Sequence, residues 1–128
     1  MERPAEEFDF DAMADTYDED GAIEALSESL KPLVIVIEGR AVSKFPDGHV
    51  YRLPLVISID DADALGSIEG DDPVRQVREL FSRLCGEKEA AALMAEPFQS
   101  VSAFAKRYFE LFERVNKVTL GESPASPR

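Results

Sequence analysis

The sequence has little of what a reactive site, a disulfide framework or a membrane anchor requires. It contains one cysteine, Cys85, and one histidine, His49. A single thiol cannot form an internal disulfide, which is typical of proteins in a reducing cytosol, and one Cys with one His cannot complete a zinc site. No apolar run reaches the roughly 18 residues of a membrane span. Residues 1–7 are acidic, whereas a secretory signal begins with basic residues. We therefore expect a cytoplasmic protein.

Motifs for catalysis and phosphate binding are also missing. The seven glycines are scattered and form neither a G-x-G-x-x-G pattern nor a P-loop. His49 lies in a turn signal without a recognisable nucleophile nearby, and Cys85 lies on an apolar helical stripe, which favours a buried, inert thiol. We predict a binding protein with no cofactor and no metal, rather than an enzyme. Because carboxylates are abundant, a catalytic pair facing each other in an apolar pocket is an open alternative.

Basic residues are outnumbered by acidic ones. The chain has 14 Lys and Arg against 26 Asp and Glu, a formal net charge of −12. Residues 1–30 alone carry −10, while residues 31–59 carry +2 and residues 60–128 carry −4. Such a chain repels phosphates and anionic lipids, so we predict neither nucleic acid nor membrane as a partner. Residues 1–30 are expected to form an acidic, flexible or transiently helical arm, with a short helix within residues 21–30.

One domain is expected after the arm. The apolar content of 45% is ordinary for a globular protein, and 128 residues leave room for one domain. We place this domain at residues 31–120 and a flexible polar tail at residues 121–128.

A β-hairpin is predicted at the start of the domain. Residues 33–37 are apolar, mostly β-branched and without a helical period. Residues 46–49, P-D-G-H, are a turn signal because Pro restricts φ and Gly permits positive φ. Residues 33–45 are therefore predicted to pair with residues 49–59, where Pro54 removes one ladder donor. A lone hairpin is marginal in water, so we expect it to pack on helices or on strands of another copy.

Three helices are predicted in the second half, which makes the fold class α+β. Asp72 as N-cap and Pro73 at the first helical position indicate a helix start, and Gly86 indicates an end. The apolar spacing predicts helices over roughly residues 73–85, 87–95 and 100–117.

Residues 61–72 align in part with a twelve-residue calcium loop. Positions one, three, six, eight and nine fit, but Leu65 takes position five, where an oxygen ligand is required. Asp72 takes position twelve, where a bidentate Glu is usual. We favour an acidic loop leading into a capped helix.

The last predicted helix has an unusually wide apolar stripe. Its apolar side chains cover more of the circumference than the roughly 100° face that one small core requires. An amphipathic helix of a partner protein, here called the client, docks into a groove through apolar side chains at positions i, i+3, i+4 and i+7. We therefore predict a client-binding stripe formed by Phe104, Tyr108, Leu111 and Phe112. The competing interpretation is that these residues complete the core.

The order of these features resembles the tail assembly chaperones of long-tailed phages that infect actinobacteria. Residues 53–61 read L-P-L-V-I-S-I-D-D, and residues 71–73 read D-D-P at a helix start. An aromatic-rich helix over residues 104–112 and a G-E-S-P-A-S tail at residues 121–126 follow. The resemblance covers roughly residues 31–126, and the helix over residues 87–95 departs from it. Each motif is short, so the resemblance depends mainly on the order of the motifs and on the tail at residues 121–126.

The resemblance implies a role in virion assembly. Members of that family bind and solubilise the tape measure protein, a long helical and apolar chain, and help to recruit tail tube subunits around it. They act in the host cell cytoplasm and are absent from the mature virion. Many are also made as a longer form by a programmed frameshift, whose extension would join here at the tail. The resemblance therefore implies this frameshift-extended form as a further partner. We further expect a homo-oligomer, because the hairpin edge and the helix stripe are both predicted to be open.

A second function class fits the charge. An acidic inhibitor or nucleic-acid mimic would present carboxylates, ordered on a folded face, to a basic host protein. The concentration of charge in an arm that is predicted to be flexible argues against this alternative.

Overall fold

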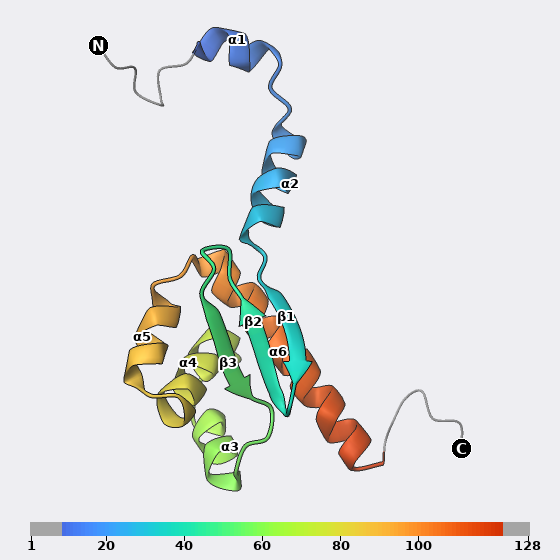
Figure 1. The fold of residues 1–128 in the computed structure, drawn as a ribbon, viewed down its shortest axis with the longest axis vertical. Coiled ribbons are helices and arrows are strands. Elements are labelled where there is room, and N and C mark those ends of the chain that lie inside the picture. The colour runs from blue at the N-terminus through green and yellow to red at the C-terminus, as the bar shows by residue number, and fades with distance from the viewer. Residues whose placement is uncertain (1–8, 122–128) are drawn as a thin grey trace.

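The computed structural model describes residues 9–121, in which two helices precede three strands and four further helices (Figure 1). This arrangement confirms the α+β fold class. The predictions for residues 1–8 of the arm and for residues 122–128 of the tail lie outside the described residues. None of the described helices combines the length and apolar character needed to cross a bilayer. The elements are α1 Phe10–Asp15, α2 Glu19–Leu30, β1 Leu33–Ile37, β2 Arg40–Lys44, β3 Val50–Pro54, α3 Ile59–Gly66, α4 Pro73–Leu84, α5 Glu87–Met94 and α6 Phe98–Thr119.

The sheet of the described chain is an antiparallel meander in the order β1-β2-β3, one strand more than the predicted hairpin. The segment predicted as one strand over residues 33–45 is two strands, because the chain reverses at Glu38 and Gly39. Their φ values are 51° and 80°. Two consecutive residues at positive φ are characteristic of the type I′ turn that connects tight hairpins. Glu seldom adopts positive φ, so the sequence contained no strong signal for this turn.

The second hairpin turn lies where the sequence predicts it. The Asp47 Oδ1 atom accepts a hydrogen bond of 2.9 Å from the main-chain N–H of His49, which stabilises the turn. β3 then ends at Pro54 instead of continuing to the predicted end of the strand. A capping box formed by Ser58 and Asp61 starts α3 soon afterwards, so the remaining apolar residues belong to a loop and a helix.

The three predicted helices are confirmed as α4, α5 and α6, with ends within two residues of the prediction. The Asp72 Oδ1 atom accepts a hydrogen bond of 3.2 Å from the main-chain N–H of Arg75, and Pro73 is the first helical residue. Gly86, with φ 101°, separates α4 from α5. Local capping chemistry therefore sets the boundaries of this half of the chain.

The core lies between the sheet and α6. Figure 1 shows α6 running behind the sheet, and α6 contacts β1, β2, α4 and α5. The buried strand residues that face α6 alternate along β2 and β3, as the two-residue period of a strand requires. Rings from the sheet, α4 and α6 meet in the centre of this core; they belong to Phe45, Tyr51, Phe81, Phe104 and Tyr108.

The acidic arm is helical over most of its described length. Figure 1 shows α1 and α2 projecting away from the domain, and neither helix contains a buried residue. The helix predicted within residues 21–30 is confirmed and is two residues longer, since α2 begins at Glu19. The Ser100 Oγ atom in α6 donates a hydrogen bond of 2.6 Å to the main-chain carbonyl of Leu30, so the end of α2 is attached to the domain.

Candidate functional site

Two of the predicted client anchors are inside the core. Phe104 and Tyr108 have no exposed surface. A client cannot contact either ring in this structure, so their prediction as surface anchors is wrong. Leu111 is 7% exposed and Phe112 is partly buried against the core, so both retain some access to solvent.

The wide stripe of α6 has a structural cause. The prediction assumed that α6 packs against one neighbour, for which a face of about 100° is sufficient. In the structure α6 packs against the sheet and also against α4, so its own core uses a wider face. A helical pattern reports which residues are apolar but not how many elements cover them.

Tyr108 shows how firmly this stripe belongs to the core. Its hydroxyl donates a hydrogen bond to the main-chain carbonyl of Pro54, at the end of β3. Its ring lies edge-on to Phe109, with ring centres 5.0 Å apart. Burial raises the pKa of Tyr108 above its usual value, so the phenol is neutral at physiological pH. The residue therefore attaches α6 to the sheet.

An open apolar groove lies further along α6. It has a volume of about 400 Å³ and lies between β1 and the C-terminal part of the helix. Its apolar side chains are accessible, since Val36 is 52% and Val118 is 63% exposed. Leu111 is the one predicted anchor that lines it. We call this site the terminal groove; its lining residues are Val36, Leu111, Arg114, Val115, Val118 and Thr119.

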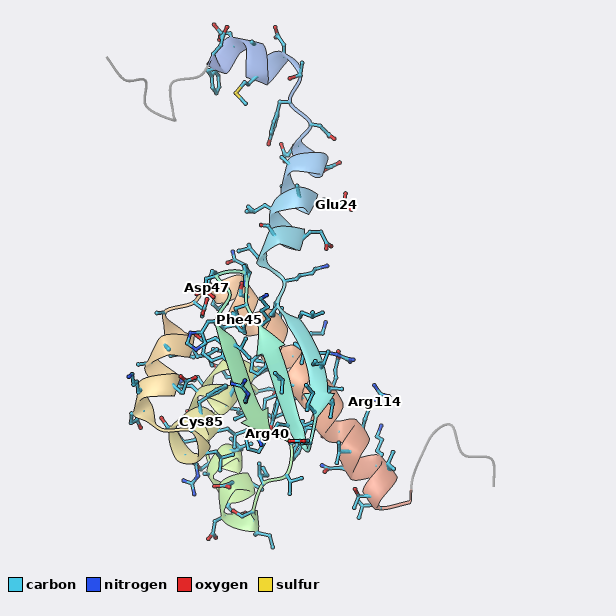
Figure 2. The ribbon with its side chains drawn as sticks, in the orientation of Figure 1. Glu24, Arg40, Phe45, Asp47, Cys85 and Arg114 are labelled. Atoms are coloured by element: carbon cyan, nitrogen blue, oxygen red, sulfur yellow. The ribbon has the colours of Figure 1, made fainter. Side chains whose placement is uncertain are left out.

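A second hollow of about 370 Å³ continues the apolar surface around the end of α6. Val115 and Thr119 line both hollows, so the last turns of α6 are accessible on two sides. Val56 and Leu120, which line the second hollow, are 74% and 73% exposed. Figure 2 shows Arg114 on the part of α6 that extends toward the C-terminus, so a cation lies beside this surface.

The edge of the sheet next to the groove is unprotected. β1 is an outer strand of the sheet, and all five of its residues are apolar. Four of the five are exposed. Within the described residues no strand pairs with the free side of β1. Proteins usually protect such edges with charges, Pro or bulges, because a bare edge can pair with another chain.

The structure also brings two carboxyl groups together near the second hairpin turn. The Tyr51 hydroxyl donates a hydrogen bond of 2.7 Å to Glu96 Oε2. Burial raises the pKa of Glu96 and the neighbouring Asp47 carboxylate raises it further, while the bond from Tyr51 opposes the increase. Asp47 is exposed and Glu96 only half-buried, so this pair lies at the surface rather than in the apolar pocket that an enzyme would use. Its contacts join the hairpin turn to the α5–α6 junction.

His49 and Cys85 have structural contacts. The His49 ring stacks on the Tyr51 ring with centres 4.0 Å apart, and its Nε2 atom is 3.6 Å from Glu89 Oε1. Cys85 is half-buried rather than fully buried as predicted, and its thiol donates to the main-chain carbonyl of Arg52 at 3.4 Å. Burial raises the pKa of the Cys85 thiol, which lowers its reactivity.

Residues 61–72, which align in part with a calcium loop, do not form a calcium site. Asp61 and Asp63 lie on α3, and the Asp61 Oδ1 atom is 2.8 Å from Arg83 Nε. Asp72 caps α4. Among residues 9–121, no three His, Cys, Asp or Glu side chains gather in a way that could hold a metal ion.

Comparison with profiles of known protein families, with curated proteins and with solved structures finds no match to this chain.

Proposed function

We propose that this chain is a phage tail assembly chaperone, a binding protein without catalytic activity, that holds an apolar helical segment of a tape measure protein in the terminal groove. The observation that carries the proposal is the exposure of Val36, Val115 and Val118 in one groove. Exposed apolar surface rimmed by polar residues is typical of a protein interaction site. A helix that presents apolar residues at i, i+3, i+4 and i+7 is a suitable occupant for such a groove.

The resemblance in motif order supplies the identity of the client. In that family the client is the tape measure protein, and the chaperone also recruits tail tube subunits. The acidic arm is consistent with this role, because its charge repels other copies and so keeps a chaperone–client complex dispersed. Deleting residues 1–30 should then lower the solubility of the client. The proposed role places the protein in the host cytoplasm and outside the finished virion.

The position of the groove also suits a frameshift-extended form. The groove and its neighbouring hollow end at Thr119 and Leu120. An extension at this end of the chain would leave the domain from the end of the groove that holds the client. Tail tube subunits recruited by that extension would then be delivered next to the tape measure protein.

Co-expression with the tape measure protein tests the proposal. The groove variant carries Val36→Ser and Val118→Ser, which are 52% and 63% exposed in the terminal groove. The control variant carries Ile59→Ser and Phe98→Ser, which are 80% and 72% exposed elsewhere. We expect the groove variant to lower the soluble fraction of the tape measure protein several-fold and the control to leave it unchanged. Equal solubility with both variants, each folded by circular dichroism, would refute the groove as the client site.

A second candidate function is an acidic inhibitor that imitates nucleic acid. It is favoured by one observation, namely that the described part of the arm places its carboxylates on folded helices. This function predicts salt-sensitive capture of a basic host protein. Capture would be lost on deletion of residues 1–30 and unchanged in the groove variant, which separates it from the chaperone function.

A further inference from the structure

The face of the sheet opposite α6 is apolar and basic. The strand register places Leu33 beside Lys44, Ile35 beside Val42, and Val42 beside Arg52. The β1 side chains on this face are 45–68% exposed. In Figure 1 this face is turned toward the viewer and no described helix lies over it. We call it the outer face; its residues are Leu33, Ile35, Ile37, Arg40, Val42, Lys44, Val50, Arg52 and Pro54.

The cations of the outer face lack acidic partners within the described chain. Arg40, Lys44 and Arg52 take part in none of the ion pairs formed between described residues. All three side chains are exposed. The charged residues of the outer face are all basic, in contrast to the net charge of −12 of the whole chain. The outer face therefore favours an occupant that is both apolar and acidic.

The described arm has this composition. Residues 9–30 contain eight acidic residues and no basic residue. Neither α1 nor α2 buries a side chain, although a 12-residue helix is marginal in water without packing. Its own domain contacts the arm near the end of α2 and leaves most of the apolar side chains of the arm exposed. Its exposed apolar side chains are Phe10, Met13, Tyr17, Ile23 and Leu26, each 57–70% exposed.

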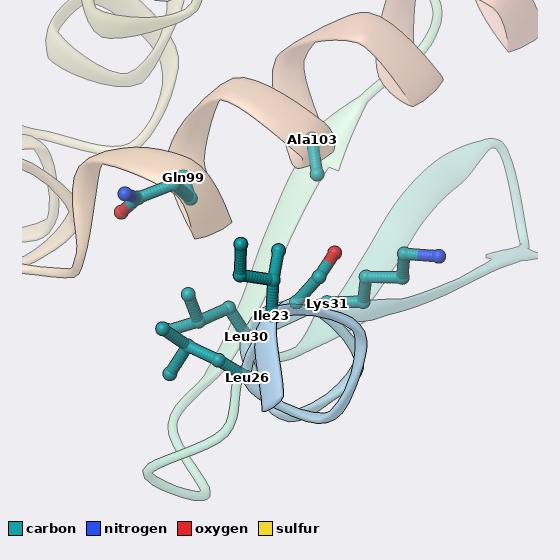
Figure 3. A pocket seen from close by; sticks show the side chains of 7 residues that line it. Ile23, Leu26, Leu30, Lys31, Gln99 and Ala103 are labelled. Atoms are coloured by element: carbon teal, nitrogen blue, oxygen red, sulfur yellow. The ribbon is translucent and has the colours of Figure 1, made fainter. Parts of the chain in front are cut away.

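The arm cannot reach the outer face of its own sheet without rearranging the junction. Only Lys31 and Pro32 connect α2 to β1, and the hydrogen bond from Ser100 fixes the last residue of α2. Figure 3 shows Ile23 and Leu26 beside Gln99 and Ala103 of α6, around an open groove of about 300 Å³. Folding back would break this junction within two residues. The outer face of a second copy requires no such change.

We propose that two copies exchange arms, so that residues 9–30 of each copy pack on the outer face of the other. The dimensions agree, because the 12 residues of α2 extend about 18 Å and the five residues of β1 extend about 17 Å. Carboxylates of the arm then lie beside Arg40, Lys44 and Arg52, while the apolar side chains of both surfaces leave water. This contact is separate from the terminal groove and does not depend on the identity of a client.

Charge reversal in matched pairs tests the exchange. A face variant carries Lys44→Glu and Arg52→Glu, and an arm variant carries Asp15→Lys and Glu24→Lys; Figure 2 labels Glu24 on α2. Sedimentation of the full-length wild-type chain at low salt should show a dimer that weakens as salt increases. Each variant alone should raise the dimer dissociation constant by about tenfold or more, because like charges then meet at both contacts.

Mixing the two variants distinguishes arm exchange from other modes of association. In a heterodimer the unchanged acidic arm meets an unchanged basic face, and the basic arm meets the acidic face. We therefore expect the mixture to recover dimers that neither variant forms alone. A control variant carries Arg78→Glu and Lys88→Glu at exposed sites on α4 and α5, and it changes the net charge by the same amount as the face variant. This control should dimerise like wild type.

Three results would overturn the proposal. The first is a wild-type chain that remains monomeric up to about 1 mM, beyond which association is too weak to matter. The second is a dimer that persists unchanged in the face or arm variant. The third is a mixture of the two variants that forms no heterodimer. Dimers that pair through the β1 edges alone would give this result, because the exchanged charges would then not meet.

Discussion

The fully buried Ser100 hydroxyl and the main-chain carbonyl of Leu30 form a 2.6 Å hydrogen bond that joins the first turns of α6 to the last residue of α2. These two residues are 70 positions apart in the chain. The bond is a specific tertiary contact between the domain and the acidic arm. It sets the point from which the arm leaves the domain, and hence which surfaces the arm can reach.

We expect Ser100→Ala to loosen α2 while the domain stays folded. Loss of one such hydrogen bond costs about 1 kcal/mol, and a helix of this length has little stability of its own. Amide hydrogen exchange over residues 19–30 should accelerate about fivefold. Ser102→Ala on the same helix is the control, because Ser102 takes part in none of the side-chain hydrogen bonds between described residues. Equal exchange rates in both variants would contradict the role of this bond.

The type I′ turn between β1 and β2 should be sensitive to a single methyl group. Gly39 has φ 80°, so Gly39→Ala should destabilise the domain by about 1–2 kcal/mol through backbone strain. Gly66 in α3 has no positive φ and nothing within 4 Å of an added Cβ, so Gly66→Ala should stabilise by about 0.5–1 kcal/mol. Midpoints of urea unfolding should shift in opposite directions. Shifts of the same sign would show that the turn is not as described.

Phe104 should behave as a core residue. Its side chain is fully buried against Phe45 and Phe81, with ring centres 5.8 and 6.2 Å away. Phe104→Ala should cost about 3–5 kcal/mol, a large share of the stability of a small domain. Val118→Ala, in the terminal groove, should cost less than about 0.5 kcal/mol. Thermal unfolding followed by circular dichroism compares them, and similar melting temperatures would restore Phe104 as a candidate surface anchor.

The Glu96 carboxyl should contribute an unusual pH dependence to stability. Burial raises its pKa above the ordinary value of 4.5, so the folded protein binds this proton more tightly than the unfolded chain does. Its contribution is complete below the unfolded pKa and is lost as pH rises through the folded pKa. Urea unfolding of wild type and Glu96→Gln should therefore diverge as pH rises through about 4.5 and above. The Gln side chain keeps an acceptor for Tyr51, and parallel stability curves would exclude this proton linkage.

Several features of this protein follow from short-range sequence signals. The Asp72-Pro73 start of α4, the positive-φ Gly86 and the Asp47-Gly48 turn each act within a few residues, so their chemistry is visible without the fold. The charge of the arm is likewise a property of composition alone. The α+β class and three helix positions could therefore be predicted. The turn at Glu38 could not, because a Glu at positive φ is imposed by strand pairing on both sides.

The functional surface was decided by tertiary structure. The sequence alone determined that α6 is rich in apolar residues, because their spacing follows the helical period. Only packing decided that Phe104 and Tyr108 are enclosed while Val115 and Val118 remain accessible. The reason is geometric: the sheet and α4 cover the first part of α6, and the last turns extend beyond them. A residue's character is local, whereas its exposure depends on every element that packs against it.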